Sequence, residues 1–153
     1  MLARGVWAGR SRAPRSTRLL EQNKQLVRRY YQQALGDLTG FEQLVAGDFV
    51  DHHFPPAIPA GPEGVRQFFR EVLGTVFSDM RIDIQRLLAE ADYVDCHFTL
   101  HARHTGEFAG IAPRCQAIRC AAISTFRVAD GKLAEAWELY DSGDLISQLR
   151  DAP

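Results

Sequence analysis

The sequence predicts an α+β domain with a cone-shaped, strongly curved and mainly antiparallel sheet wrapped around N-terminal helices. Three observations lead to this prediction. Apolar residues in the first half of the chain recur every three or four positions, which is the pattern of amphipathic helices. From residue 81 the spacing changes to every second position, which is the pattern of strands. Helices that precede a run of strands give an α+β domain, and a curved sheet on one long helix leaves an apolar pocket.

Two long helices are expected before the sheet. The first covers residues 17–35, because Thr17 can cap its start and Gly36-Asp37 ends it. A short helical piece follows over 41–46. The second long helix begins at Gly61-Pro62, since proline is well tolerated at the first helical position. Its broad apolar face needs a large partner surface, which a sheet provides.

The strands follow in a nearly unbroken series. Residues 49–54 read as a brief extended segment that prolines terminate. Longer strands are expected over 81–89 and 93–104. Between residues 117 and 141, two apolar runs flank Asp130-Gly131, which is a strong hairpin signal.

The return strand of that hairpin organises the predicted site. Strict alternation puts Leu133, Glu135, Trp137 and Leu139 on one face, and Ala134, Ala136, Glu138 and Tyr140 on the other. Neither face is polar throughout, so both are expected to be covered. Small alanines beside Glu138 favour a lined pocket over a solid core.

The hairpin loop decides which residue lies opposite Glu138. A two-residue loop pairs Glu138 with Ile123. A three-residue loop with a bulge at Gly131 pairs it with Ala122 instead. The sequence leaves both registers open.

Length and charge indicate one domain, over residues 17–150, behind a basic leader. Residues 1–16 are rich in arginine and carry no acid, as in a transit peptide or a disordered tail, and we expect disorder. Beyond the five arginines of the first 20 residues, 13 basic residues face 19 acidic ones. A mildly acidic domain argues against a nucleic-acid partner. No apolar run approaches the roughly 20 residues that span a membrane.

Three cysteines, Cys96, Cys115 and Cys120, form no CxxC pair and leave one unpaired. This pattern indicates a reducing compartment, and we expect a cytoplasmic protein with free thiols. Cys96 and Cys120 fall inside strand patterns, where small core residues are common. A catalytic thiol is the alternative.

Glu138 and Asp141 are the first candidates for chemistry. A carboxylate in a water-poor pocket has its charged form disfavoured, so its pKa rises from about 4.3 toward neutrality. Such a group can take and return a proton beside a carbonyl. The alternative is a structural carboxylate that forms a salt bridge with Arg103, Arg119 or Arg127.

The histidines do not predict a metal site. His97 and His101 share a strand face but lie about 13 Å apart at ~3.3 Å per residue, whereas one ion needs ligands at ~2 Å. His104 ends its strand before a glycine loop, where it is either a hydrogen-bonding group at the pocket rim or a partly exposed strand-end residue. Tyr30, Tyr31 and Asp51 can reach the same pocket from the helical side, although both tyrosines also fit a core role.

Several segments together resemble the SnoaL-like polyketide cyclase family, of the nuclear-transport-factor-2-like superfamily. The resemblance covers roughly residues 20–150, and its segments are Asn-Lys-Gln-Leu-Val-Arg-Arg-Tyr-Tyr (23–31), Asp-Phe-Val-Asp-His-His (48–53), Gly-Pro-Glu-Gly-Val (61–65), His-Thr-Gly-Glu-Phe-Ala-Gly-Ile-Ala-Pro (104–113) and Asp-Gly-Lys-Leu-Ala-Glu-Ala-Trp-Glu-Leu-Tyr-Asp (130–141). It implies a curved sheet, three helices, a deep apolar pocket and frequent homodimers. The best-studied members close a polyketide ring by intramolecular aldol condensation without metal or cofactor.

The resemblance also assigns roles. The acid/base aspartate of those cyclases falls at Glu138, their pocket histidine falls at Ser124, and His104 matches a family histidine. We therefore expect Glu138 to move a proton, with Asp141 and His104 orienting the substrate or polarising its oxygen. The residues expected to contact the ligand are Tyr30, Asp51, His53, Phe69, Ser124 and Trp137.

The predicted function is cofactor-independent proton transfer, an aldol cyclisation or isomerisation, on an apolar small molecule that bears a carbonyl. Because serine replaces the family histidine at Ser124, a non-catalytic pocket protein that binds an apolar ligand is the alternative. An epoxide- or water-adding enzyme is a third reading, which needs an Asp-Arg-Asp network.

Overall fold

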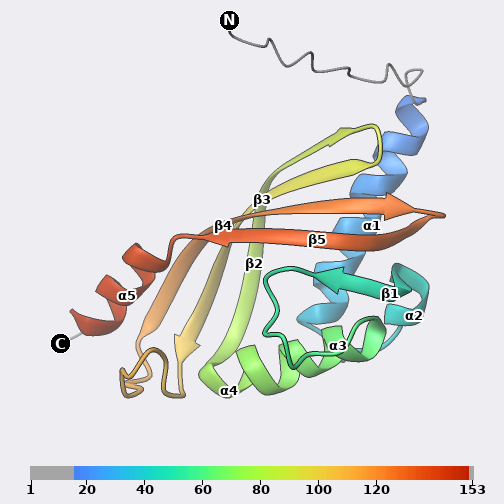
Figure 1. Cartoon of the computed structure of the whole chain (residues 1–153). Coiled ribbons are helices and arrows are strands. Elements are labelled where there is room, and N and C mark those ends of the chain that lie inside the picture. The colour runs from blue at the N-terminus through green and yellow to red at the C-terminus, as the bar shows by residue number, and fades with distance from the viewer. Residues whose placement is uncertain (1–15, 152–153) are drawn as a thin grey trace, which may run out of the picture.

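The computed structural model describes residues 16–151 as one domain of helices packed on a curved sheet (Figure 1). The predicted disordered leader, residues 1–16, lies outside the described residues except for Ser16. Ser16, and not Thr17, caps the first helix, because its hydroxyl accepts the backbone N–H of Leu19. None of the helices between residues 16 and 151 is long and apolar enough to cross a membrane.

The first helix, α1 (Thr17–Ala34), supplies the inner support of the fold. Its apolar residues recur at helical spacing, so Val27, Tyr30, Tyr31 and Ala34 form one buried face. That face packs against strands β2, β3 and β5, which places both tyrosines inside the curve of the sheet.

Between α1 and the long strands, the chain forms short elements. They are α2 (Phe41–Leu44), β1 (Val45–Asp51), α3 (Pro62–Gln67), the π-helical segment η1 (Phe68–Leu73) and α4 (Gly74–Val76). The predicted extended segment 49–54 is thus a strand that begins and ends earlier, because β1 pairs in parallel with β5. The second long helix is present, but a π-helical segment interrupts it.

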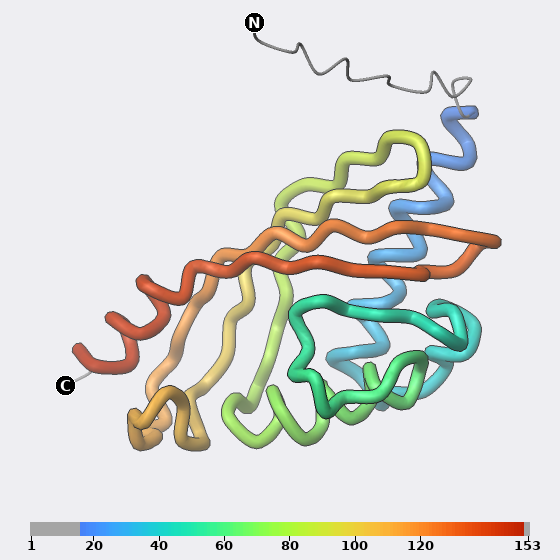
Figure 2. The backbone as a smooth tube through the Cα atoms, in the orientation of Figure 1, coloured from blue at the N-terminus to red at the C-terminus, as the bar shows by residue number. Residues whose placement is uncertain are grey.

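The four long strands are β2 (Phe77–Glu90), β3 (Tyr93–His104), β4 (Ala117–Ala129) and β5 (Lys132–Tyr140). The sheet order is β1-β5-β4-β3-β2, and every pairing except β1 with β5 is antiparallel. Figure 2 shows β2 and β3 bending along their length, so that the open sheet curls around α1. This is the α+β fold with a curved, mainly antiparallel sheet that the sequence predicts.

The hairpin between β4 and β5 has a register that neither sequence prediction anticipated. Asp130 and Gly131 form a two-residue turn with positive φ angles of 50° and 74°. Arg127 then pairs with Glu135 while Val128 pairs with Leu133, so that Ala134 is an extra, bulged residue. As a result Glu138 lies opposite Ser124, not opposite Ile123 or Ala122.

Because of this bulge, the side chains of β5 are divided between the two faces of the sheet differently from the prediction. Leu133 is fully buried and shares the inner face with Ala136 and Glu138, because one extra residue reverses the alternation. The expectation that both faces are covered is also wrong for the single chain. On the outer face, Leu139 is 81% exposed and Ile123 is 44% exposed.

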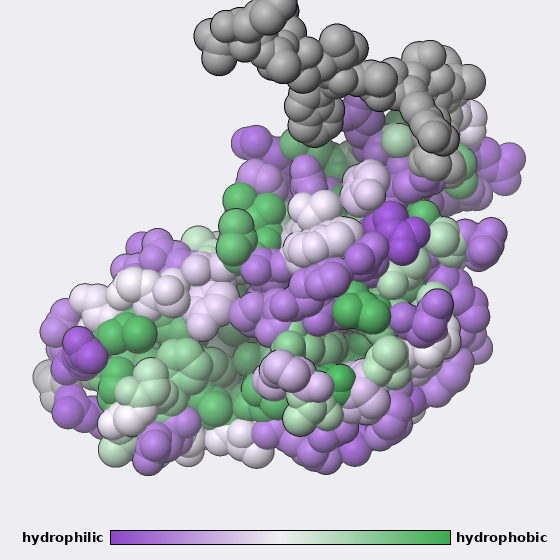
Figure 3. Space-filling model, in the orientation of Figure 1, coloured by the Kyte–Doolittle hydropathy of each residue, from purple (hydrophilic) through white to green (hydrophobic). Residues whose placement is uncertain are grey.

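The helix α5 (Ser142–Arg150) closes the remaining end of the sheet. Its apolar residues Leu145 and Leu149 pack with Ile118 and Cys120 of β4. Figure 3 shows apolar side chains gathered in a hollow of the surface below β5, between α5 and the α3–α4 segment. This hollow is where the candidate site opens.

Candidate active site

A cavity of about 240 Å³ lies between the concave face of the sheet and helix α1, and η1 and α5 also contribute residues to its wall. Aromatic rings make up much of its wall: Tyr30, Tyr31, Phe54, Phe68, Phe69, Phe77, Phe98, Phe108, Phe126 and Tyr140. Two carboxylates and one imidazole also line the cavity. They are Asp51 of β1, His53 of the loop after β1 and Glu138 of β5. Among the described residues, no lysine or arginine lines this cavity. The site is thus an apolar pocket with one polar end.

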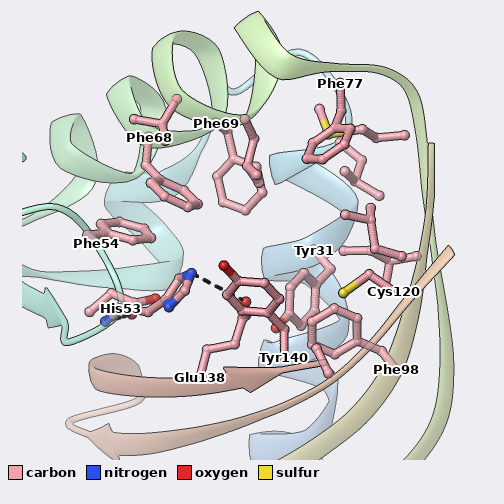
Figure 4. Close-up of a pocket in the computed structure, with 18 of the residues that line it drawn as sticks. Tyr31, His53, Phe54, Phe68, Phe69, Phe77, Phe98, Cys120, Glu138 and Tyr140 are labelled. Atoms are coloured by element: carbon pink, nitrogen blue, oxygen red, sulfur yellow. Dashed lines mark hydrogen bonds and ion pairs between the residues drawn. The ribbon is translucent and has the colours of Figure 1, made fainter. Parts of the chain in front are cut away.

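Glu138 is the carboxylate at that polar end. Its Oε2 accepts a hydrogen bond of 2.8 Å from Ser124 Oγ, and its Oε1 lies 3.9 Å from His53 Nε2 (Figure 4). The side chain keeps 25% of its surface exposed, at the lining of the cavity. Burial raises the pKa of Glu138 above its usual value, the Ser124 hydrogen bond and His53 partly oppose the rise, and the charge of Asp51 adds to it.

Ser124 is held in turn by α1. Its Oγ accepts a hydrogen bond of 2.9 Å from the hydroxyl of Tyr31. Ser124 stands behind the cavity wall, 2% exposed, so the structure gives it contact with Glu138 rather than a place in the lining. Sequence analysis did not assign Tyr31 this role, because the adjacent Tyr30 has the same burial pattern and only the three-dimensional register distinguishes them.

Asp51 and His53 occupy the other side of the polar end. The carboxylate of Asp51 accepts the backbone N–H of His53 at 2.9 Å, which fixes the chain just after β1. Burial raises the pKa of Asp51, and the His53 N–H partly opposes the rise. The His53 ring is edge-on to Tyr140 and Phe68, with centroid distances of 5.4 and 6.2 Å. These contacts aim the imidazole at Glu138 (Figure 4).

Tyr30 and Phe69, for which the sequence predicts ligand contact, lie in the cavity wall. Their rings meet edge to face at 6.2 Å, and Tyr30 makes a similar contact with Phe126. Burial raises the pKa of Tyr30 well above its usual value, so its phenol stays neutral. The two side chains therefore shape the apolar part of the site.

Besides Ser124, three predicted site residues do not line the cavity. Asp141 is exposed and caps α5, since its carboxylate accepts the N–H of Asp144 at 3.0 Å. Trp137 points to the outer face of the sheet and stacks on His52 at 5.0 Å, because it alternates with Glu138. The expected roles of these two in orienting or contacting a ligand do not agree with these positions.

His104 is the third. It is fully buried, which excludes the reading of an exposed strand-end residue. Its ring lies 6.2 Å from Phe77, behind the cavity wall, and neither ring nitrogen has a hydrogen-bond partner within residues 16–151. His104 is therefore not at the rim of the pocket, where the sequence predicts a hydrogen-bonding group.

Other readings of the sequence can be compared with the same geometry. Arg127 pairs with Glu135 on the outer face at 2.9 Å, whereas Glu138 contacts Ser124 and His53 and forms no salt bridge with an arginine of residues 16–151. Burial raises the pKa of Cys120 to about 11 and that of Cys96 to about 12, so both thiols are protonated at neutral pH and are poor nucleophiles. Residues 16–151 contain no group of three side chains arranged to hold a metal ion.

Comparisons with known proteins agree with the fold. A family model described as SnoaL-like polyketide cyclase matches residues 24–149. No curated protein matches the chain. Among solved structures, IdmH from Streptomyces antibioticus, a candidate polyketide cyclase, is 25% identical with a TM-score of 0.71, over 84% of this chain and 99% of that one.

Two further structures come from other bacteria. A candidate polyketide cyclase from Bacillus cereus is 26% identical with a TM-score of 0.72, over 89% of this chain and 85% of that one. A candidate SnoaL-like polyketide cyclase from a Jannaschia species is 21% identical with a TM-score of 0.73, over 95% of this chain and all 100% of that one. The match to the Jannaschia protein supports the fold alone.

Proposed function

This chain belongs to the SnoaL-like polyketide cyclase family, and on that premise we propose that it catalyses proton transfer on an apolar small molecule that bears a carbonyl. The reaction would be an aldol cyclisation or an isomerisation. One observation carries the proposal: a carboxylate with a raised pKa, Glu138, stands at the single polar end of an aromatic cavity. A base whose pKa is moved toward the working pH is suited to taking a proton beside a carbonyl.

The geometry supports different roles for Glu138 and His53 in the reaction. Glu138 would take a proton from the carbon next to the carbonyl, and the electrons of that C–H bond would form an enolate. His53, whose Nε2 is 3.9 Å from Glu138 Oε1, would stabilise the charge on the enolate oxygen. In a cyclisation, the enolate carbon would bond to a second carbonyl carbon, and the proton would pass to the new alkoxide.

Turnover of polyketide esters and cyclic ketones by the wild type and by Glu138→Gln tests this proposal. We expect the variant to lose about a hundredfold or more of the rate, because general base catalysis contributes ~10²–10⁴. The matched control is Glu135→Gln, on the same strand but on the outer face, where Glu135 binds His52 and Arg127. Retained turnover in Glu138→Gln would remove this carboxylate from the mechanism.

A non-catalytic pocket protein is the second candidate, and Ser124 favours it. Serine at this position supplies no ring nitrogen, so the site has one proton-transfer group fewer than the family pattern implies. Native mass spectrometry of freshly purified protein distinguishes the two functions. A co-purified ligand that stays unchanged on incubation supports the binding protein, and a ligand that is converted supports the enzyme.

We also propose that two copies associate through the outer face of the sheet. Ile123 and Leu139 form a cross-strand apolar pair there, and both are largely exposed in the single chain. A twofold contact lets one such patch cover its own copy. Sedimentation of the wild type and of Leu139→Glu tests this, with a dimer expected for the former and a monomer for the latter; a monomeric wild type would contradict it.

A further inference from the structure

Glu138 is the end point of a hydrogen-bonded relay that begins on α1. The hydroxyl of Tyr31 donates to Ser124 Oγ at 2.9 Å, and the hydroxyl of Ser124 donates to Glu138 Oε2 at 2.8 Å. Tyr31 is 5% exposed and Ser124 is 2% exposed, so both hydroxyl groups belong to buried side chains. The relay joins the first helix to the last strand across the floor of the cavity.

The chemistry of the three groups fixes the direction of the relay. An ionised carboxylate only accepts hydrogen bonds, so Ser124 must give its single hydrogen to Glu138. Ser124 then offers a lone pair to Tyr31, whose phenol keeps its proton because burial raises its pKa well above the usual value. Each hydroxyl hydrogen thus has one acceptor, and both residues that carry these hydroxyls are buried.

We propose that Tyr31 is a positioning residue for Glu138: acting through Ser124, it holds Oε2 as an acceptor and leaves Oε1 as the oxygen that takes the proton. Oε1 is also the oxygen that points toward His53, across the polar end of the cavity (Figure 4). A proton on Oε2 would make Ser124 accept from Glu138 as well as from Tyr31, which the two lone pairs of its oxygen allow. The hydroxyl hydrogen of Ser124 would then lose its acceptor in a buried place, which is costly.

The part of this proposal that concerns proton transfer by Oε1 rests on the proposed function. The hydrogen bonds of the relay do not depend on it. The ionisable groups that interact with Glu138 come from several elements: Tyr30 and Tyr31 on α1, Asp51 on β1, His53 in the following loop, Cys96 on β3 and Cys120 on β4. Tyr30 is the natural control among them. It is buried and lines the same cavity, yet the hydrogen bond to Ser124 comes from Tyr31.

The test follows the ionisation of Glu138 in the unliganded full-length protein. Glutamate labelled with ¹³C at the side-chain carboxyl gives one resonance that is absent from Glu138→Gln, and its shift is titrated with pH. Ser124→Ala is expected to raise the pKa of Glu138, because it removes a bond that favours the charged form. Tyr31→Phe should raise it by a smaller amount, and Tyr30→Phe should leave it unchanged.

A double variant makes the test specific to the relay. Tyr31→Phe is expected to add no shift in the Ser124→Ala background, because Tyr31 acts only through that serine. Equal shifts from Tyr31→Phe and Tyr30→Phe, or a Tyr31→Phe shift that persists without Ser124, would overturn the proposal. If Ser124→Ala does not fold, Ser124→Cys replaces it, since a thiol fills the space with only a weak donor.

The outcome is separable from that of the proposed function. Turnover that survives Glu138→Gln would remove the reaction from Glu138 but would leave the titration result standing. Conversely, a titration without coupling between Tyr31 and Ser124 would leave Glu138 as a base while removing Tyr31 as its positioning residue. If both hold, the acid limb of the kcat/KM profile should move with the titrated pKa in Tyr31→Phe but not in Tyr30→Phe.

Discussion

The hydroxyl of Ser124 donates to Oε2 of Glu138 at 2.8 Å, across two strands that meet at that pair. This bond holds one oxygen of Glu138, the one glutamate among the described residues that line the cavity. We expect Ser124→Ala to lower kcat/KM about tenfold, since a hydrogen bond to a charged group is worth ~1.5–3 kcal/mol and 1.4 kcal/mol is a factor of ten. Steady-state kinetics on any substrate that the wild type turns over provides the measurement.

Thr125 offers a control for that variant on the same strand. Its hydroxyl donates to the carboxylate of Asp95 at 2.7 Å on the opposite face of the sheet. Thr125→Val removes a bond of the same kind without touching the cavity, so kcat/KM should stay within about twofold. An equal loss in both variants would mean that general destabilisation, and not the position of Glu138, explains the result.

The bulge at Ala134 predicts an unusual tolerance to deletion. Removing Ala134 restores a regular hairpin, in which the Asp130-Gly131 turn is kept and Glu138 still lies opposite Ser124. Removing Trp137 instead moves Glu138 one place, to the outer face opposite Thr125. We expect the Ala134 deletion to retain activity and the Trp137 deletion to abolish it, as measured by turnover alongside circular dichroism. Loss of activity in both deletions would show that the bulge itself is needed.

The raised pKa of Glu138 predicts a stability cost that depends on pH. A carboxyl whose folded pKa lies above its unfolded value stabilises the fold at low pH, and that contribution is lost as pH rises through the folded pKa. Glu138→Gln should therefore have a higher Tm than the wild type at pH 7, with the gap closing as pH falls toward 4. Thermal melts across this range measure the effect.

Glu135 should behave in the opposite way. Hydrogen bonds from His52 and Arg127 lower the pKa of Glu135, so its ionised form supports the fold above the usual carboxyl pKa and loses that support as pH falls. Glu135→Gln should then be no more stable than the wild type at pH 7. A higher Tm for both variants would point to net charge as the cause rather than burial of Glu138.

The size of the cavity predicts that a larger side chain in its wall weakens ligand binding. Ala122 lines the cavity opposite Tyr140, and Ala121 faces outward on the same strand. Ala122→Leu should fill part of the roughly 240 Å³ and weaken ligand binding at least tenfold, whereas Ala121→Leu should not. Calorimetry with a bound or turned-over ligand gives the two affinities. Unchanged binding in Ala122→Leu would place the ligand elsewhere.

Much of this fold can be predicted from the sequence where patterns are long and local. Strand β3 begins at Tyr93 and ends at His104, as alternation predicted, because twelve residues of period two leave little ambiguity. The strand β1 was less clear, because its parallel partner lies near the far end of the chain. The π-helical turn of η1 likewise leaves no mark in a spacing of three and four.

Only part of the site can be predicted from the sequence, because its contacts join residues that are far apart in the chain. Glu138 was found from its small neighbours, but its partner depended on a bulge that the residues around Ala134 do not signal. Asp141 follows the strand closely in sequence, yet the chain has already turned into α5 there and uses the carboxylate as a cap. Tyr31 and Tyr30 are adjacent on a helix, and only the packed structure shows which hydroxyl reaches Ser124.

The relay from α1 to β5 has a consequence for how the protein is made. Tyr31 and Ser124 are 93 residues apart, and Glu138 belongs to the final strand. The ribosome therefore synthesises Tyr31 on α1 long before it synthesises Glu138 on β5. Any chain that terminates before Glu138 carries the aromatic part of the floor without its carboxylate, so the complete relay can form only after β5 has been synthesised.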